Sequence, residues 1–346
     1  MEFVDLRSDT VTQPTPQMRA AMAAAEVGDD VYNEDPTINR LQEMAAARMG
    51  KEAGLFVSSG TLGNLTAILT HCGRGDEVIL GNLGHTFLFE AGGIAALGGV
   101  HSYLLPNQPD GTLRVEDIRA AVRDPEDVHE PISRLITLEN TQNRCGGVPL
   151  TAAYMDEVKS VAQDYGLKIH LDGARIFNAA AALNVPVARL TEAADSVTFC
   201  LSKGLCAPVG SVLCGSQEFI QRARRIRKQL GGGMRQAGVL AAAGIIALEQ
   251  MVDRLPEDHC RAQKLAQGLA RIPGIKVERE NPPSNMVFFT LEEGVSLTPA
   301  EIVSRLLDYK VKVGLAGPHR FRMVTHYWID DEGVDRTLRA FREVLG

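Results

Sequence analysis

Apolar runs alternate with alanine-rich, amphipathic stretches along most of the first 270 residues. Seven of these runs have the length and composition of β-strands, and helical patterns lie between most of them. The predicted strands cover residues 54–57, 77–80, 100–104, 134–138, 167–171, 196–200 and 211–214. The predicted helices cover residues 37–49, 63–72, 115–122, 151–165 and 217–255, the last interrupted near 231–233. This alternation predicts an α/β domain whose mostly parallel seven-stranded sheet is covered by helices.

The pattern differs at the two ends of the chain. After residue 273, short strands at 275–277, 286–291 and 321–325 combine with a helix at 299–309 and a closing helix, which is typical of a small α+β domain. The first 35 residues contain prolines and glycine in the manner of an extended segment. We therefore predict an N-terminal arm at 1–35, a large domain at 36–272 and a small C-terminal domain at 273–346.

Charge and cysteine content narrow the class of protein. The formal net charge of −7 gives no reason to expect nucleic acid or an anionic membrane as a partner. The six cysteines lack metal-binding spacing, so they are expected to be reduced thiols with neither a disulfide framework nor a metal site. The first residues do not have the pattern of a secretory leader, and no long uncharged apolar run occurs. These features favour a cytoplasmic protein.

The first candidate for chemistry is the loop that follows the predicted strand at 54–57. In open α/β sheets, ligands bind beyond the carboxyl ends of the strands, which directs attention to such junctions. This loop reads Ser58-Ser59-Gly60-Thr61 and opens into a helix, so backbone N–H groups and hydroxyls face a helix N-terminus. Such a place favours phosphate, although an ordinary helix cap also accounts for the residues. The loop has neither a Walker nor a G-x-G-x-x-G pattern, so it does not imply a nucleotide.

Three further junctions carry ionisable residues. Asp172 follows the strand at 167–171, where it could pair with a protonated ring nitrogen or cap a helix. Lys203 follows the strand at 196–200, where loss of solvation favours the neutral amine that a Schiff base requires, although a surface lysine fits as well. His85 follows the strand at 77–80 and could lie over a planar ring or be merely structural. Together the junctions supply what one phosphorylated aldehyde cofactor needs.

At these residues the chain resembles the low-specificity L-threonine aldolases, which are pyridoxal-phosphate enzymes of the aspartate aminotransferase-like class. The resemblance covers nearly the whole chain. It rests on D-L-R-S-D-T from residue 5, G-D-D-V-Y from 28, S-S-G-T from 58, L-E-N-T from 138, H-L-D-G-A-R from 170, L-S-K-G from 201 and G-G-M-R-Q from 232. The resemblance implies cleavage of L-threonine, L-allo-threonine and related β-hydroxy-α-amino acids to glycine and an aldehyde, in threonine degradation and glycine synthesis.

The resemblance also implies roles for individual residues in binding the cofactor. Lys203 is implied as the lysine bound covalently to pyridoxal 5'-phosphate, Asp172 as the partner of the ring nitrogen, and His85 as the group stacked on the ring. The phosphate is expected at Ser59, Gly60 and Thr61. Arg175 and Arg235 are the remaining implied cofactor ligands, Arg235 reaching the phosphate of a neighbouring subunit. The basic run before Arg235, at 222–228, is expected to be a solvated helix face.

For the substrate, the resemblance implies that Ser8, Arg175 and Arg322 hold the carboxylate, because guanidinium groups bind carboxylates through two parallel hydrogen bonds. Arg320 shares a strand face with Arg322 and is the less favoured choice. Tyr32 and His85 are the other implied substrate contacts. His85 or His129 is the expected base for the β-hydroxyl proton, with His129 setting the choice between threonine and allo-threonine. A shared site implies at least a dimer, and the family usually forms tetramers.

One position departs from the family pattern: Gln142 stands where members commonly have histidine, which puts rate or side-chain preference in doubt. Two other functions of the same cofactor, β-elimination and racemisation, stay open because the electron sink is shared. A catalytically silent binding protein and a nucleotide-dependent oxidoreductase are further alternatives. The intact lysine, acid and histidine argue against a silent binding protein, and the missing glycine fingerprint argues against an oxidoreductase.

Overall fold

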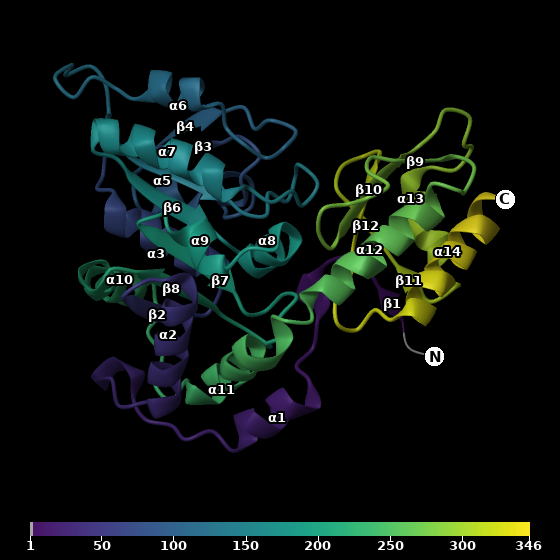
Figure 1. Cartoon of the computed structure of the whole chain (residues 1–346), viewed down its shortest axis with the longest axis horizontal. Helices are drawn as coiled ribbons and strands as arrows, with labels where there is room; N and C mark the ends of the chain where they lie inside the picture. The colour runs from purple at the N-terminus through teal and green to yellow at the C-terminus, as the bar shows by residue number, and fades with distance from the viewer. Residues whose placement is uncertain (1–2) are drawn as a thin grey trace. The chain divides into compact units, whose positions relative to one another are not determined.

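The computed structural model describes residues 3–346, and these fold into two compact units. One unit comprises residues 14–252, and the other combines the N-terminal residues up to Gln13 with residues 253–346 (Figure 1). Met1 and Glu2, the first residues of the predicted arm, lie outside the described residues. Within residues 3–346, none of the helices has the length and apolar character needed to cross a membrane.

A seven-stranded sheet forms the centre of the larger unit, in the order β2-β8-β7-β6-β5-β3-β4. Its strands are β2 (Ala53–Val57), β3 (Asp76–Gly81), β4 (His101–Leu105), β5 (Ile132–Glu139), β6 (Lys168–Asp172), β7 (Ser196–Cys200) and β8 (Ser211–Gly215). β8 is antiparallel to both of its neighbours, and the other six strands run in one direction. The predicted sheet is confirmed, and every predicted strand agrees with an observed one to within two residues.

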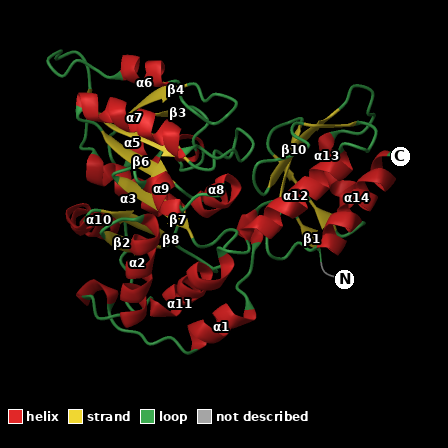
Figure 2. Cartoon of the chain, in the orientation of Figure 1, coloured by secondary structure: helices red, strands yellow, loops and turns green. Residues whose placement is uncertain are grey.

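Helices cover the sheet in two groups (Figure 2). α3 (Gly60–His71), α5 (Gly93–Ala96) and α10 (Gln217–Gln229) share apolar clusters with β2, β3, β5 and β8. The other group contains α2 (Pro36–Met49), α6 (Val115–Ala121), α7 (Ala152–Tyr165) and α9 (Val187–Thr191), which contact one another and the strands. The remaining helices of this unit are α1 (Pro16–Ala23), α4 (His85–Leu88), α8 (Ile176–Leu183) and α11 (Gly238–Ile246), with a π-helical turn at Ala247–Met251.

The strand order places a topological switch point between β3 and β5. From β3 the chain crosses to β4 on one side, whereas from β5 it crosses to β6 and β7 on the other. Right-handed crossovers in opposite directions put the connecting helices on opposite faces of the sheet, so a crevice opens where the carboxyl ends of β3 and β5 diverge. This geometry predicts a ligand site at the ends of β3, β5 and β6.

The smaller unit is α+β. Its antiparallel sheet has the order β12-β13-β10-β9, and β1 (Val4–Asp5) pairs with β11 (Val311–Lys312) in parallel. This antiparallel sheet consists of β9 (Ile275–Val277), β10 (Met286–Leu291), β12 (Gly314–Leu315) and β13 (Arg320–Val324). The helices of the unit are α12 (Leu255–Leu269), α13 (Pro299–Leu306) and α14 (Asp331–Leu345). One core contains Val4, Leu6, Leu265 and Phe341.

The compact units have different bounds from the predicted domains. Residues 253–272 belong to the smaller unit, because α12 packs its apolar face into that unit's core together with the N-terminal strand. The predicted helix at 217–255 consists of α10, α11 and a π-helical turn, separated by a break at residues 230–237 that is longer than expected. Part of the predicted arm is the helix α1, capped by the Thr15 hydroxyl and packed against α11.

Candidate active site

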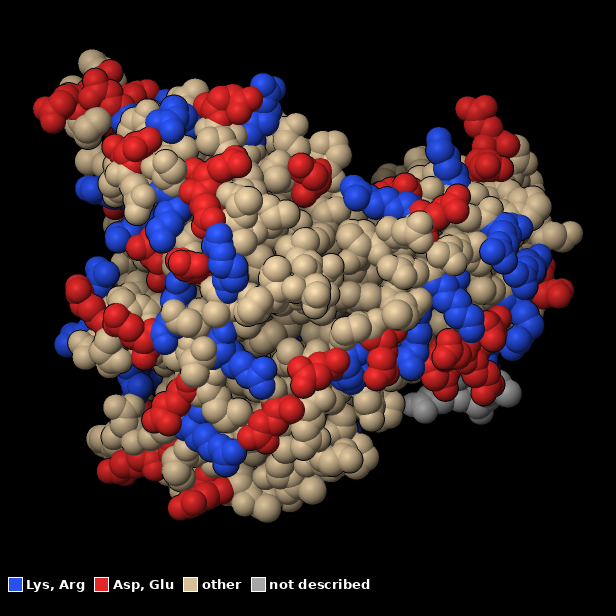
Figure 3. Space-filling model, in the orientation of Figure 1, with Lys and Arg blue, Asp and Glu red and all other residues tan. Residues whose placement is uncertain are grey.

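The carboxyl ends of β3, β5, β6 and β7 carry most of the polar side chains that the sequence singles out. His85 begins α4 just after β3, Glu139 ends β5, Asp172 ends β6, and Lys203 lies in the loop after β7. On the face seen in Figure 3, basic and acidic side chains are interspersed. Neither sign of charge dominates this face.

Asp172 is buried, with its carboxylate held in a fixed orientation. Its Oδ2 accepts a hydrogen bond of 2.9 Å from Asn64 Nδ2, and its Oδ1 accepts one of 3.1 Å from the backbone of Ala174. Asn64 lies on α3, whose close approach to β7 depends on Gly63, since a Cβ there would lie 2.5 Å from Thr198 Cγ2. The acid at this strand end is thus positioned from two neighbouring elements.

His85 is held through both its backbone and its ring. Its backbone N–H donates to Glu139 Oε2 at 2.7 Å, and its Nδ1 lies 2.9 Å from Oε1 of the buried Glu90. The hydrogen bond to Glu90 raises the pKa of His85, while burial and the charge of Lys203 oppose that shift. The ring is about one-third exposed, so Nε2 is the nitrogen left for a ligand.

Glu139 fastens the His85 segment to the end of β5. Its two carboxyl oxygens accept from the backbone N–H groups of His85 and Asn143. Burial raises the pKa of Glu139 to about 7, and the neighbouring charge of Asp172 acts in the same direction. Sequence reasoning assigned no role to Glu139, Glu90 or Asn64, although the position of Glu139 at a strand end was an available signal.

Lys203 lies in the turn after β7 and is partly buried. Its charge is close enough to His85 to act on the pKa of the imidazole. The turn is closed by a backbone hydrogen bond of 2.9 Å from Cys206 to the Lys203 carbonyl. The charge of the Lys203 amine therefore affects the protonation of the His85 imidazole.

The N-terminus of α3 supplies the predicted anion-binding groups. Ser59 is the N-cap, and its hydroxyl oxygen accepts from the Leu62 backbone at 3.1 Å, which leaves the hydroxyl hydrogen to donate. Gly60 and Thr61 form the first turn, where backbone N–H groups point out of the helix. A Cβ at Gly60 would lie 3.0 Å from Cys200 Sγ, so glycine permits close packing against the end of β7.

Arginines expected at the site occupy different surroundings. Arg175 is buried at the start of α8. Arg235 is 55% exposed and pairs with Asp29 at 2.9 Å, next to the exposed Tyr32. Within the smaller unit, Arg322 Nη2 lies 3.3 Å from the Arg7 carbonyl, adjacent to Ser8.

Arg320 is engaged elsewhere in the smaller unit. It binds Glu278 through two hydrogen bonds and lies 4.1 Å from the centre of the Phe288 ring. Those contacts occupy its guanidinium and favour Arg322 as the ligand for a substrate carboxylate.

Two sequence-based expectations differ from the structure. His129 precedes β5 and lies at the amino edge of the sheet, opposite Asp172; the seven steps from Ile132 to Glu139 alone span about 23 Å. His129 is exposed and bound to Asp127, so within one copy of the chain it does not lie near Asp172. The basic run is not a uniformly solvated face, because Arg227 is buried and pairs with Asp30 at 2.6 Å.

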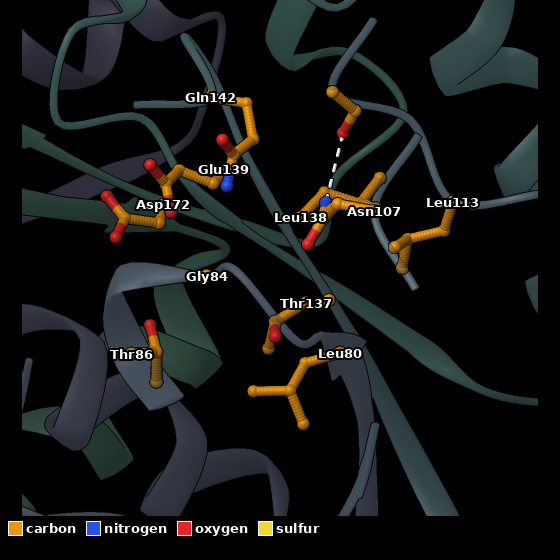
Figure 4. Close-up of a pocket in the computed structure, with 12 residues that line it drawn as sticks. Leu80, Gly84, Thr86, Asn107, Leu113, Thr137, Leu138, Glu139, Gln142 and Asp172 are labelled. Atoms are coloured by element: carbon orange, nitrogen blue, oxygen red, sulfur yellow. Dashed lines mark hydrogen bonds between the residues drawn. The ribbon is translucent and has the colours of Figure 1, made fainter. Parts of the chain in front are cut away.

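A small pocket of about 20 Å³ opens between the ends of β3, β5 and β6 (Figure 4). Asp172, Glu139 and Gln142 lie along its upper side in this view, and Thr86 lies below. Its volume fits one water-sized molecule. Gln142 donates to the Leu83 carbonyl at 3.1 Å and accepts from the Cys145 backbone at 2.8 Å, so the amide that departs from the family pattern links the His85 segment to the next turn.

The donor set fits a phosphorylated pyridine aldehyde. A buried carboxylate, an imidazole beside an amine, and a helix N-terminus with a free hydroxyl hydrogen lie around the same sheet edge. In addition, Glu90 Oε2 and Thr198 Oγ1 are buried without a hydrogen-bond partner among residues 3–346. Clustered buried acids favour a cationic ligand, and the helix terminus favours an anionic one.

Comparisons with known proteins agree with this arrangement. A model of the beta-eliminating lyase family matches residues 5–292. The chain is 50% identical over 344 residues to a probable low-specificity L-threonine aldolase 2 of Arabidopsis thaliana, covering 99% of this chain and 97% of the relative. It is 48% identical to the low specificity L-threonine aldolase of Escherichia coli strain K12, over 84% of this chain and 85% of the relative. The chain therefore belongs to the beta-eliminating lyases and, within them, to the low-specificity L-threonine aldolase family.

A solved structure of a threonine aldolase from Leishmania major has the same fold. It matches with a TM-score of 0.84 and 22% sequence identity over 99% of both chains. This likeness confirms the predicted fold class, and the sequence comparisons confirm the predicted family.

Proposed function

We propose that this protein catalyses the reversible cleavage of L-threonine, L-allo-threonine and related β-hydroxy-α-amino acids to glycine and an aldehyde, acetaldehyde in the case of threonine, with pyridoxal 5'-phosphate as cofactor. Family membership supports the reaction. The observation that carries the proposal is the buried Asp172, fixed by Asn64 and Ala174 at the same sheet edge as His85 and Lys203.

Four elements are proposed to hold the cofactor. The amine of Lys203 binds its aldehyde carbon, and Asp172 pairs with its protonated ring nitrogen. Ser59, Gly60 and Thr61 bind the phosphate through the N-terminus of α3. Arg175 adds positive charge. When bound, the cofactor supplies an electron sink for the pair of electrons released when the Cα–Cβ bond breaks.

The remaining proposed roles concern the substrate. Arg322, with Ser8 and Arg175, binds the carboxylate, a choice supported by the engagement of Arg320 with Glu278. His85 stacks over the ring and takes the β-hydroxyl proton at Nε2, since its Nδ1 is held by Glu90. Because His129 lies at the opposite edge of its own sheet, its proposed role in discriminating threonine from allo-threonine requires a second copy of the chain.

We also propose a homo-oligomer, at least a dimer and by family analogy a tetramer, in which Arg235 and Tyr32 reach the neighbouring site. Their exposed fractions of 55% and 70% suit residues that contact a partner. A cytoplasmic location, with a role in threonine degradation and glycine synthesis, is proposed along with it. Light scattering after size-exclusion chromatography tests the assembly, and a monomer retaining full activity contradicts the shared site.

The decisive experiment for the reaction is product analysis. Purified protein saturated with pyridoxal 5'-phosphate is incubated with threonine and with allo-threonine, and the products are separated. Glycine and acetaldehyde in equal amounts are expected. Ammonia with a 2-oxo acid would instead indicate β-elimination, inversion at Cα would indicate racemisation, and either as the main outcome overturns the proposal.

A further inference from the structure

Glu90 lies at the Nδ1 edge of the His85 ring and is almost completely enclosed. Its side chain is 3% exposed, and its Oε1 lies 2.9 Å from His85 Nδ1. The same oxygen lies 2.9 Å from Asn64 Nδ2, which also binds Asp172 Oδ2 at 2.9 Å. The Asn64 amide therefore bridges the carboxyl groups of Glu90 and Asp172.

The orientation of the Asn64 amide follows from its neighbours. Both carboxyl oxygens are acceptors, so the NH₂ end of the amide must face them and the carbonyl end must face His170 Nε2, at 3.1 Å. His170 must then donate from Nε2. Burial lowers the pKa of His170 to about 3, so the ring is neutral and its Nδ1 is an acceptor.

The remaining hydrogen bonds of this network have the same donor-to-acceptor direction. His170 Nδ1 accepts from the Ser196 hydroxyl at 2.9 Å, which leaves the serine oxygen to accept from His71 Nε2 at 2.8 Å. Burial lowers the pKa of His71 to about 4, so that ring is neutral as well and carries its proton on Nε2. The opposite direction would place the Asn64 carbonyl against both carboxyl groups. A chain of donors running from His71 through Ser196, His170 and Asn64 thus ends on Glu90 and Asp172.

From this geometry we infer that Glu90 is a positioning residue for the reaction: as the terminal acceptor of this donor chain, it holds His85 with its proton on Nδ1 and its lone pair on Nε2. The inference deepens the proposed function and rests on it. A histidine whose Nδ1 proton is bound to a carboxylate has its tautomer and ring orientation fixed, and Nε2 becomes the basic nitrogen. The ionisable groups that act on His85 are Glu90, Asp172, Glu139 and Lys203.

Glu90→Met tests the inference, because methionine has nearly the same length but removes the oxygen that accepts from both His85 Nδ1 and Asn64 Nδ2. The tautomer is read by solid-state NMR of protein labelled with ¹⁵N-histidine, with and without cofactor, and His85→Gln assigns the signal. We expect a Nδ1–H signal in the wild type and its loss in Glu90→Met, where Nδ1 has no acceptor. We also expect kcat to fall by about 10²- to 10⁴-fold, the scale of general base catalysis and of a wrong tautomer. The acidic limb of the kcat/KM profile should move to lower pH, since the carboxyl group that favours imidazolium is gone.

Glu77→Met is the matched control. Glu77 is another buried glutamate that lies 2.9 Å from a histidine Nδ1, that of His101, but it is near the amino end of β3. The control variant should leave the His85 signal and the pH profile unchanged, and Glu90→Asp should restore part of the Nδ1–H signal. A wild-type protein that cleaves threonine while carrying the His85 proton on Nε2 overturns the inference alone, as does a Glu90→Met variant with the wild-type tautomer and pH profile. A folded wild type that binds pyridoxal 5'-phosphate but cleaves no β-hydroxy-α-amino acid refutes the proposed function instead.

Discussion

Replacement of Arg227 by methionine measures how strongly the segment before α2 is tied to the larger unit. Arg227 Nη2 lies 2.6 Å from Asp30 Oδ2, and Nη1 donates to the Phe56 carbonyl at 2.7 Å. The two side chains are 3% and 1% exposed. Methionine fills much of the same space but leaves the Asp30 carboxylate buried without its cation. Breaking a buried pair in this way costs about 3–5 kcal/mol, and the uncompensated charge accounts for most of that cost.

The assay is urea unfolding followed by circular dichroism on cofactor-free protein at one fixed concentration, so that ligand and assembly contribute equally to each variant. Arg225→Met, an exposed change on the same helix, is the control and should shift the free energy of unfolding by about 0.5 kcal/mol or less. The double variant Asp30→Asn/Arg227→Met removes both charges and should regain part of the loss. Equal stabilities of Arg227→Met and Arg225→Met would refute the reasoning.

Other predictions concern the site and its pH dependence. Lys203→Ala should remove the visible absorbance of bound cofactor together with cleavage activity; retention of both would exclude Lys203 as the covalent ligand. Asp172→Asn should lower kcat by orders of magnitude, because an amide does not stabilise a protonated ring nitrogen, while equilibrium dialysis should still show cofactor binding through the phosphate site at Ser59, Gly60 and Thr61; an unchanged kcat would exclude that role for Asp172. Because the folded-state pKa of His71 is depressed to about 4, protons bind more tightly to the unfolded chain, and stability should fall as the pH drops from about 6.5 to about 4. His71→Gln keeps a donor without titrating, so its unfolding free energy should depend less on pH in that window; an unchanged slope would contradict the shift.

The sheet was predictable because its central strands β3, β6, β7 and β8 are almost entirely buried and therefore read as continuous apolar runs. Residues 196–200 were predicted without error, and the others to within two residues. No helix was predicted over the residues of α12 after Leu255, and the predicted boundary at 272 placed them in the large domain. α12 packs against α14 and β10, and Val4 and Leu6, from the opposite end of the chain, belong to the same core. Sequence patterns therefore located the strands with more certainty than this helix or the bounds of the two units.

The same limit explains which site residues were found. Asp172, His85 and Lys203 follow strands that the pattern identifies, and the rule that ligands bind beyond strand ends is enough to select them. The same rule places His129 away from these three residues, because His129 precedes the predicted strand at 134–138 and must lie at the other edge of the sheet. Arg227 was taken for a solvated charge because a basic helix shows no sign in sequence of the carboxylate that it meets.

Glu90 and Asn64 show where local sequence carries no signal at all. One follows a single helical turn and the other lies in the first half of α3, positions where polar residues are usually solvated. They become site residues only because the tight contact of Gly63 with β7 brings α3 against the sheet, so that one amide reaches both Glu90 and Asp172. The acidity of the site therefore depends on helix packing as much as on strand ends, and substitutions at Gly63 should disturb His85 and Asp172 together although they contact neither.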